Sequence, residues 1–155
     1  MVFKIKPILC FLLLVFLSSC SYFSFYSMLN QYDHLGRREG HWIEYWDDST
    51  KTKSMDGYFK ENREVKRVTY YYSNGKPSNQ FKYRCRGRVK VKFWDIQGRL
   101  VQKGTSLLTR DKNEIHYRYH GIWTFYDTNG RVIDKARYIE GNLDSTYVYK
   151  SRSKQ

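Results

Sequence analysis

A short motif recurs along this chain: two adjacent aromatic residues, a turn-forming polar residue, then Gly and a basic residue. Residues 125–131 (FYDTNGR) carry the motif in full, and residues 93–99 (FWDIQGR) match them position for position. Residues 71–76 (YYSNGK) form a copy one residue shorter, and a fourth copy opens at Tyr45 without the Gly. Self-similarity at a spacing of about 20 to 50 residues is typical of repeat architectures, in which each unit buries apolar surface against its neighbours.

Each copy contains the chemistry of a tight β-turn. An Asp that opens a turn can accept a hydrogen bond from a backbone amide two residues on, and a Gly that closes it adopts the left-handed conformation without a Cβ penalty. The residues that predict the turns are Asp95, Gly98, Asp127, Gly130, Asn74 and Gly75. The Asp copies fit a three-residue hairpin loop, whereas Asn74 and Gly75 fit that loop or a two-residue turn.

Extended, aromatic-rich segments flank these turns, and no segment after the N-terminal region shows helical periodicity. The expected strands are 41–46, 53–60, 64–72, 80–85, 89–94, 100–104, 114–126 with a break near Gly121, and 132–139. We expect an all-β fold in which antiparallel hairpin repeats form a single twisted meander sheet. The aromatic residues expected in its core are Trp42, Trp46, Tyr72, Trp94, Trp123 and Tyr126.

Two segments extend the motif into a longer unit. Residues 36–46 (GRREGHWIEYW) and 119–131 (YHGIWTFYDTNGR) place a Gly-x-Trp before the aromatic pair. This arrangement resembles the variant MORN repeat family, over about residues 35–144. The resemblance implies a MORN-like sheet of hairpins. It also implies a possible role as the antitoxin component of a toxin-antitoxin system, because many relatives carry that label.

The N-terminus has the pattern of an exported precursor. Lys4 and Lys6 precede an apolar segment from Ile8 to Leu17, which fits a signal-peptide core and is too short to cross a bilayer as a helix. The sequence Leu17-Ser18-Ser19-Cys20 follows and resembles the bacterial lipobox, whose Cys is acylated before cleavage leaves it as the first residue. The alternatives are an ordinary cleaved signal and an uncleaved anchor.

These patterns divide the chain into four parts: a lipoprotein signal peptide with its helix at residues 1–19, a tether at 20–34, a repeat domain at 35–144 and a basic tail at 145–155. Acylation of Cys20 would attach the domain to a leaflet of the bacterial cell envelope. Ser21 follows Cys20 and is no inner-membrane retention signal, which favours the outer membrane.

The chain is strongly basic, with a formal net charge of +13. Alternate positions from 84 to 92 would share one strand face if the segment stayed extended. These candidate polyanion-binding residues are Arg84, Arg86, Arg88, Lys90 and Lys92. The alternative is a solvated face that discourages edge pairing. If Cys20 is acylated, anionic lipid, glycan or an acidic protein is a better partner than nucleic acid, which we do not expect.

Cys85 would be the one cysteine left in the mature chain that is not acylated, since Cys10 lies in the signal and Cys20 would carry lipid. It alternates with Phe81 and Tyr83, which predicts a small buried side chain on a strand. The alternative is an exposed thiol that acts as a nucleophile.

The sequence contains no pattern of catalytic residues, metal ligands or cofactor-binding loops that spacing can single out. His116 and His120 would lie on one face of a strand, and two ligands do not define a metal site. We therefore expect no catalysis, cofactor, metal or small-molecule substrate. The expected function is a lipid-anchored binding or scaffold module for a macromolecule or membrane surface; the alternative is an antitoxin-like inhibitor of a partner protein.

Overall fold

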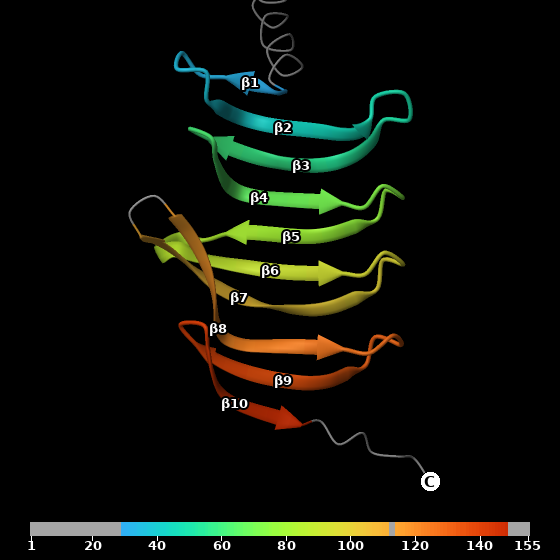
Figure 1. Ribbon diagram of the computed structural model, residues 1–155, viewed down its shortest axis with the longest axis vertical. Coiled ribbons are helices and arrows are strands. Elements are labelled where there is room, and N and C mark those ends of the chain that lie inside the picture. Colours follow the sequence, from blue (N-terminus) through green and yellow to red (C-terminus); the bar gives the residue numbers. More distant parts are fainter. Residues whose placement is uncertain (1–28, 112–113, 149–155) are drawn as a thin grey trace, which may run out of the picture.

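The computed structural model describes residues 29–111 and 114–148 and is all-β over these ranges. Ten antiparallel strands lie in one open sheet, in which every strand pairs with its neighbours in sequence (Figure 1). This confirms the predicted all-β class and the single meander. The predicted signal helix, Cys20 and the end of the basic tail lie outside the described residues.

The strands extend the sheet beyond the predicted repeat at both ends. They are β1 (Gln31–Tyr32), β2 (Arg38–Asp47), β3 (Thr52–Lys60), β4 (Arg63–Tyr71), β5 (Pro77–Tyr83), β6 (Arg88–Trp94), β7 (Leu100–Asp111), β8 (Glu114–Tyr126), β9 (Val132–Ile139) and β10 (Asn142–Val148). The first strand lies in the segment that the sequence assigned to the tether. β10 continues four residues past Asp144, into the segment assigned to the tail.

The recurring motif forms hairpin turns with a shared pattern of backbone hydrogen bonds. In the last copy, the Gly130 amide donates to the Asp127 carbonyl (3.0 Å) and the Asp127 amide donates to the Arg131 carbonyl (2.9 Å). The same pair of bonds recurs at residues 95–99. Gly130 and Gly98 have φ values of 76° and 84°, which only glycine adopts without strain.

The hydrogen bonds also correct the sequence alignment of the copies. Tyr72 occupies the position of Asp95, because its amide donates to the Lys76 carbonyl and its carbonyl accepts from the Gly75 amide. The copy therefore begins at Tyr70 and is as long as the others. A further copy, which the sequence analysis did not identify, forms the turn from Asp33 to Arg37.

Two neighbouring turns on one edge of the sheet, the right-hand edge in Figure 1, are hydrogen-bonded to each other. Asn74 donates from Nδ2 to the Ile96 carbonyl (2.7 Å), and Lys76 donates from Nζ to the Gln97 carbonyl (2.8 Å). The Tyr72 hydroxyl donates to the Trp94 carbonyl (2.8 Å). These bonds tie the β4–β5 hairpin to the β6–β7 hairpin in addition to the strand pairing.

One face of the sheet, here called the core face, buries most of the large apolar side chains. It has two clusters, the first formed by Trp42, Met55, Phe59 and Val68 and the second by Val89, Val91 and Trp123. The first cluster comes from the consecutive strands β2, β3 and β4, since residues paired across an antiparallel sheet lie on the same face. The second joins β6 to β8, whose side chains meet over Gly104 of the intervening strand β7.

The predicted core aromatics divide between the two faces. Trp42 and Trp123 are buried, but Trp46 is 58% exposed, so its assignment to the core was wrong. Trp46 lies within the register shift between Tyr45 and Asp47, near the end of the β2–β3 hairpin, where its indole donates instead to the Tyr71 carbonyl (2.9 Å). Trp94, Tyr126 and Tyr72 are half-buried and belong to neither buried cluster.

Trp123 packs on a strand backbone that carries no side chain. A Cβ atom at Gly104 would lie 2.2 Å from the indole ring, so this glycine provides the space that the ring fills. The indole also donates from Nε1 to the Thr105 carbonyl (2.8 Å). Gly104 is therefore required for close approach, whereas Gly130 is required for its backbone conformation.

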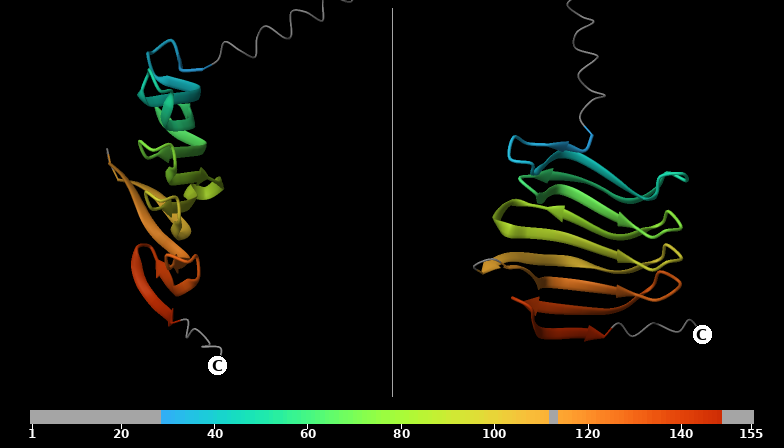
Figure 2. Two further views of the ribbon diagram at one scale, coloured as in Figure 1. Left: turned by 90° about the vertical axis from the view of Figure 1, so that its right-hand side faces the viewer. Right: turned by 45° about the horizontal axis from the view of Figure 1, so that its top comes forward.

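Strand β7 continues past the predicted strand 100–104 and ends at Asp111. This part of β7 and the start of β8 form an arm that leaves the plane of the sheet (Figure 2). The arm contacts the core face, where Tyr117 lies 5.8 Å from Phe81 between ring centroids and its hydroxyl is 2.8 Å from that of Tyr83.

We predict that Gly104→Ala and Gly130→Ala both destabilise the protein, for different reasons. The first should cost about 1 to 3 kcal/mol by overpacking against Trp123. The second should cost about 1 to 2 kcal/mol through left-handed strain alone, since no atom lies within 4 Å of a Cβ at that position. Urea unfolding midpoints of the full chain measure both.

Asparagine separates the two causes because it tolerates the left-handed conformation but is larger than alanine. Gly130→Asn should be less destabilising than Gly130→Ala, and Gly104→Asn more destabilising than Gly104→Ala. The opposite order at either position would contradict the cause assigned to it.

Candidate anion-binding face

The face opposite the core face carries basic side chains that lie directly beside one another. Arg67 pairs with Lys82, Lys82 pairs with Lys90, and Lys92 pairs with Lys103 across the β4 to β7 strands. All five side chains are exposed. We call this set of Arg67, Lys82, Lys90, Lys92 and Lys103 the cationic face.

Like charges at directly opposite positions of a sheet destabilise it. Within the described residues, no carboxylate forms an ion pair with any member of the cationic face. The repulsion is therefore relieved only by solvent, salt ions or a bound anion.

The structure places the predicted basic stripe on two different elements. Arg88, Lys90 and Lys92 alternate along β6 and are exposed on one face, as an extended segment requires. Arg84 and Arg86 instead belong to the turn before β6, so the expectation of one straight five-residue stripe was wrong. A short 3-10 turn, η1 (Cys85–Gly87), separates β5 from β6. Within this turn Arg86 has a φ of 59°.

Aromatic rings lie beside the cations of this face. Lys92 places its Nζ 5.9 Å from the centre of the Trp94 ring, and Lys103 places its Nζ 5.3 Å from that of Tyr126. Both distances are within the range of cation–π attraction. In the copies at residues 93–99 and 125–131, the first aromatic of the pair packs with the second core cluster and the second aromatic lies beside a lysine.

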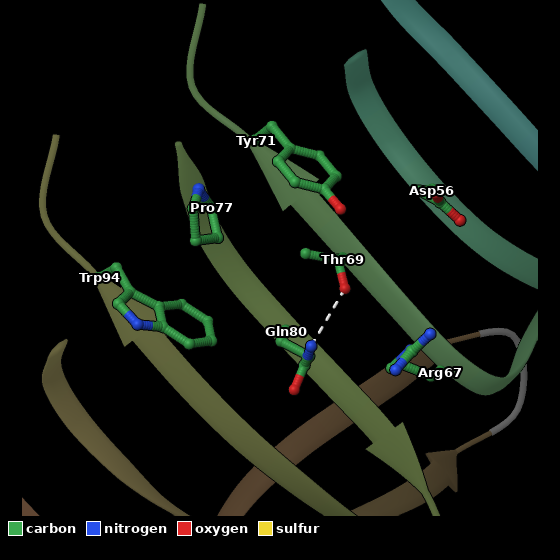
Figure 3. Close-up of a pocket in the computed structure, with 7 residues that line it drawn as sticks. All are labelled: Asp56, Arg67, Thr69, Tyr71, Pro77, Gln80 and Trp94. Atoms are coloured by element: carbon green, nitrogen blue, oxygen red, sulfur yellow. Dashed lines mark hydrogen bonds between the residues drawn. The ribbon is translucent and has the colours of Figure 1, made fainter. Parts of the chain in front are cut away.

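A hollow of about 290 Å³ lies at one end of the cationic face. Figure 3 shows Tyr71, Pro77 and Trp94 on one side of it and Arg67 on the other. The remaining lining residues are Asp56, Thr69 and Gln80, and Gln80 donates from Nε2 to the Thr69 hydroxyl (3.2 Å).

The acidic residue of this hollow is already neutralised. Asp56 accepts hydrogen bonds from Lys53 Nζ (2.7 Å) and His41 Nε2 (2.8 Å). Partial burial raises the pKa of Asp56, but the bonds from Lys53 and His41 outweigh it and hold the pKa below its usual value. Asp56 therefore remains ionised and paired, and it contributes little repulsion toward an anion.

A second and larger hollow, of about 500 Å³, lies beside the η1 turn. Its lining residues are Arg84, Cys85, Arg88, Lys90, Thr105, His120 and Gly121. Cys85 is exposed here, which corrects the prediction of a buried strand residue. The η1 turn is the reason, because it removes Cys85 from the strand alternation. Sequence reasoning found the cations of this hollow but not Thr105 or His120, which come from β7 and β8.

The core face has its own cleft, of about 330 Å³, between the arm and the sheet. Glu64 accepts hydrogen bonds there from the hydroxyls of Tyr70 and Tyr83. Burial, together with these bonds to Glu64, raises the pKa of both phenols above their usual value of 10.0. The phenols therefore stay protonated at neutral pH and connect strands β4, β5 and the arm.

The two histidines singled out in the sequence do not meet. His116 pairs with Thr109 and His120 with Thr105, on the same side of the arm. His116 has Glu114 at 3.4 Å, whereas His120 lines the second hollow. Among residues 29–111 and 114–148, no three His, Cys, Asp or Glu side chains are grouped so that they could hold a metal ion.

Comparison with known proteins gives no family. No family model matches the sequence, and no curated protein matches it. The crystal structure of the GtfA/B complex aligns with 57% of this chain and 19% of its own chain, at 16% identity and a TM-score of 0.22. This chain thus spans about a fifth of that protein, and a likeness of this size carries no argument about either fold or function. In the described part of the chain, no helix has the length and apolar character needed to span a membrane.

We predict that the protein loses stability as the pH rises above about 10, because its unfolded chain would release phenolic protons that Tyr70 and Tyr83 retain when folded. This stabilisation is fully present below pH 10 and declines above it. The free energy of unfolding should fall by at most about 1.4 kcal/mol per pH unit for each phenol, and by less where solvent screens the group. Thermal melting from pH 8 to pH 11 measures it.

Tyr83→Phe should make the alkaline decline shallower, and Tyr147→Phe, which removes an exposed tyrosine on β10, should leave it unchanged. If the two variants show parallel pH dependence, the Glu64 network is not the cause.

Proposed function

We propose that this protein is a non-catalytic binding module of the variant MORN repeat type, and that its cationic face docks on an anionic membrane surface. An acylated Cys20 would hold the domain at a leaflet of the bacterial envelope. The observation that carries the proposal is the direct pairing of like charges from Arg67 to Lys103 without carboxylate partners among the described residues.

Binding of anions to the cationic face would lower its electrostatic energy. A sheet that places lysines opposite one another has a cost in the free state, and a layer of anions removes that cost on contact. Each basic group near an anionic leaflet contributes about 1 kcal/mol of attraction. The members of the cationic face are therefore enough to orient the domain, even though each contact is weak.

The shape and surroundings of the face also suit a membrane. Residues of strands β3, β4, β5 and β6 line its first hollow, so an extended surface can contact several strands at once. Trp94 and Tyr126 stand beside the lysines, and such amphipathic rings are favoured at membrane interfaces. The chain from Cys20 to Leu29 has a reach of at most about 30 Å, which keeps the domain near its anchor.

We predict that Lys92→Gln/Lys103→Gln weakens binding of the full chain to vesicles of phosphatidylcholine and phosphatidylglycerol by about 30-fold. The estimate is two lost attractions of about 1 kcal/mol each. The matched control is Lys60→Gln/Arg131→Gln, which removes the same charge at the edges of the sheet. Co-sedimentation at low and high salt measures the affinities.

Equal losses in the two variants would contradict a role for the cationic face. Undiminished binding by Lys92→Gln/Lys103→Gln would do the same. Capture of an acidic protein by the wild type, but not by this variant, with no vesicle preference, would favour the antitoxin-like alternative over the membrane.

We predict that Cys20 carries the anchor. Cells fed a palmitate analogue should label the wild-type protein and Cys85→Ala, but not Cys20→Ala, because acylation occurs on the lipobox cysteine. The Cys20→Ala protein should also leave the membrane fraction. Retention of label in Cys20→Ala would contradict the anchor without bearing on the cationic face.

A further inference from the structure

We propose that the hollow beside the η1 turn is a binding site for a phosphate monoester group. This inference rests on the proposed function, because the hollow shares Lys90 with the cationic face and the inference specifies which anion binds there. Its residues are Arg84, Arg88, Lys90, Thr105 and His120.

The lining of the hollow has the charge that a dianion requires. Three of its side chains are the cations Arg84, Arg88 and Lys90, and no acidic residue lines it. Planar guanidinium groups can bind two oxygens of one phosphate, and hydrogen bonds between charged partners are about twice as strong as neutral ones. A phosphate monoester carries close to two negative charges and several acceptor oxygens, so it matches this set better than a carboxylate does.

Two further side chains add hydrogen-bonding capacity to the cations. Thr105 and His120 are cross-strand partners on β7 and β8, so their side chains lie together. The Nδ1 atom of His120 is buried and has no hydrogen-bond partner. Leaving a buried polar atom unsatisfied is costly, and a phosphate oxygen in the hollow can accept a hydrogen bond from this nitrogen when the nitrogen carries the proton and the ring turns toward the hollow.

The backbone holds the hollow in shape without a ligand. The Arg84 amide donates to the Arg88 carbonyl (2.8 Å), which closes the turn. Gly87 packs on β7 so closely that a Cβ would lie 3.0 Å from the Leu108 carbonyl oxygen. On the opposite wall, Gly121 has a φ of 70° beside a register shift between β7 and β8, which sets the position of His120. The site is thus built from two fixed glycine positions.

Inorganic phosphate is the first probe. It should bind the full chain with saturation and raise its melting temperature, since a ligand that binds only the folded state stabilises it. Arg88→Gln/Lys90→Gln should weaken phosphate binding at least about tenfold, because two charge-assisted hydrogen bonds are lost. Acetate at the same ionic strength should have no such effect.

The control is Lys92→Gln/Lys103→Gln, which removes the same charge from the same surface outside the hollow. It should retain phosphate binding while losing vesicle binding. Thr105→Val is a second variant that preserves side-chain shape and the net charge, and it should weaken phosphate binding without lowering the melting temperature in acetate.

Phosphate and acetate acting alike on the wild type would overturn the site and leave the cationic face intact. Equal loss of phosphate affinity in the two charge variants would also overturn it. If vesicle binding failed as well, the proposed function would fall with the site.

Vesicles distinguish the sources of the phosphate. Phosphatidate presents a monoester and phosphatidylglycerol a diester, so a preference for phosphatidate that Arg88→Gln/Lys90→Gln abolishes identifies a lipid headgroup. Phosphate binding without a preference between the two vesicles identifies free phosphate as the ligand.

Discussion

A single sheet has two faces, and this chain can bury only one of them. The two buried clusters lie on the core face, and the opposite face carries the lysines and arginines of β4 to β7 with the rings of Trp94 and Tyr126 beside them. This asymmetry depends on the hairpin turns, because each turn returns the chain in a register that keeps apolar side chains aligned across neighbouring strands. The basic surface follows from the same alignment, which places Lys92 opposite Lys103 and Lys82 opposite Lys90.

Features of the fold that depend only on a few consecutive residues could be predicted from the sequence. A turn with Asp at its start and Gly at its end needs only five consecutive residues, so the hairpins near Asp95 and Asp127 could be recognised from local chemistry. Alternation predicted the exposed positions of β6 for the same reason. The sequence alignment placed Tyr72 in the aromatic pair, although it occupies the first position of the turn. That position is defined by backbone hydrogen bonds, which residues with different side chains can form.

The parts that depend on distant contacts could not be predicted. Cys85 was expected in a strand because nothing local shows that Gly87 packs against Leu108 on β7 and permits a turn. Trp46 was expected in the core because the register shifts around it arise from pairing with β3. The hollow beside the η1 turn is lined by residues of β6 together with Thr105 and His120. The spacing of these residues in the sequence does not show that they lie close together.

Every strand pairs with the strand before and after it in the chain, so the sheet contains no long-range crossing. Such a topology has a low contact order, which is associated with fast folding for a β protein. It also gives the domain the behaviour of a linear array, whose outer hairpins can open while the centre stays closed. The last strand, β10, is hydrogen-bonded on one side only. Strands β10 and β9 can therefore separate from the sheet, up to the β8 strand that carries Trp123, while the basic surface between β4 and β7 keeps its shape.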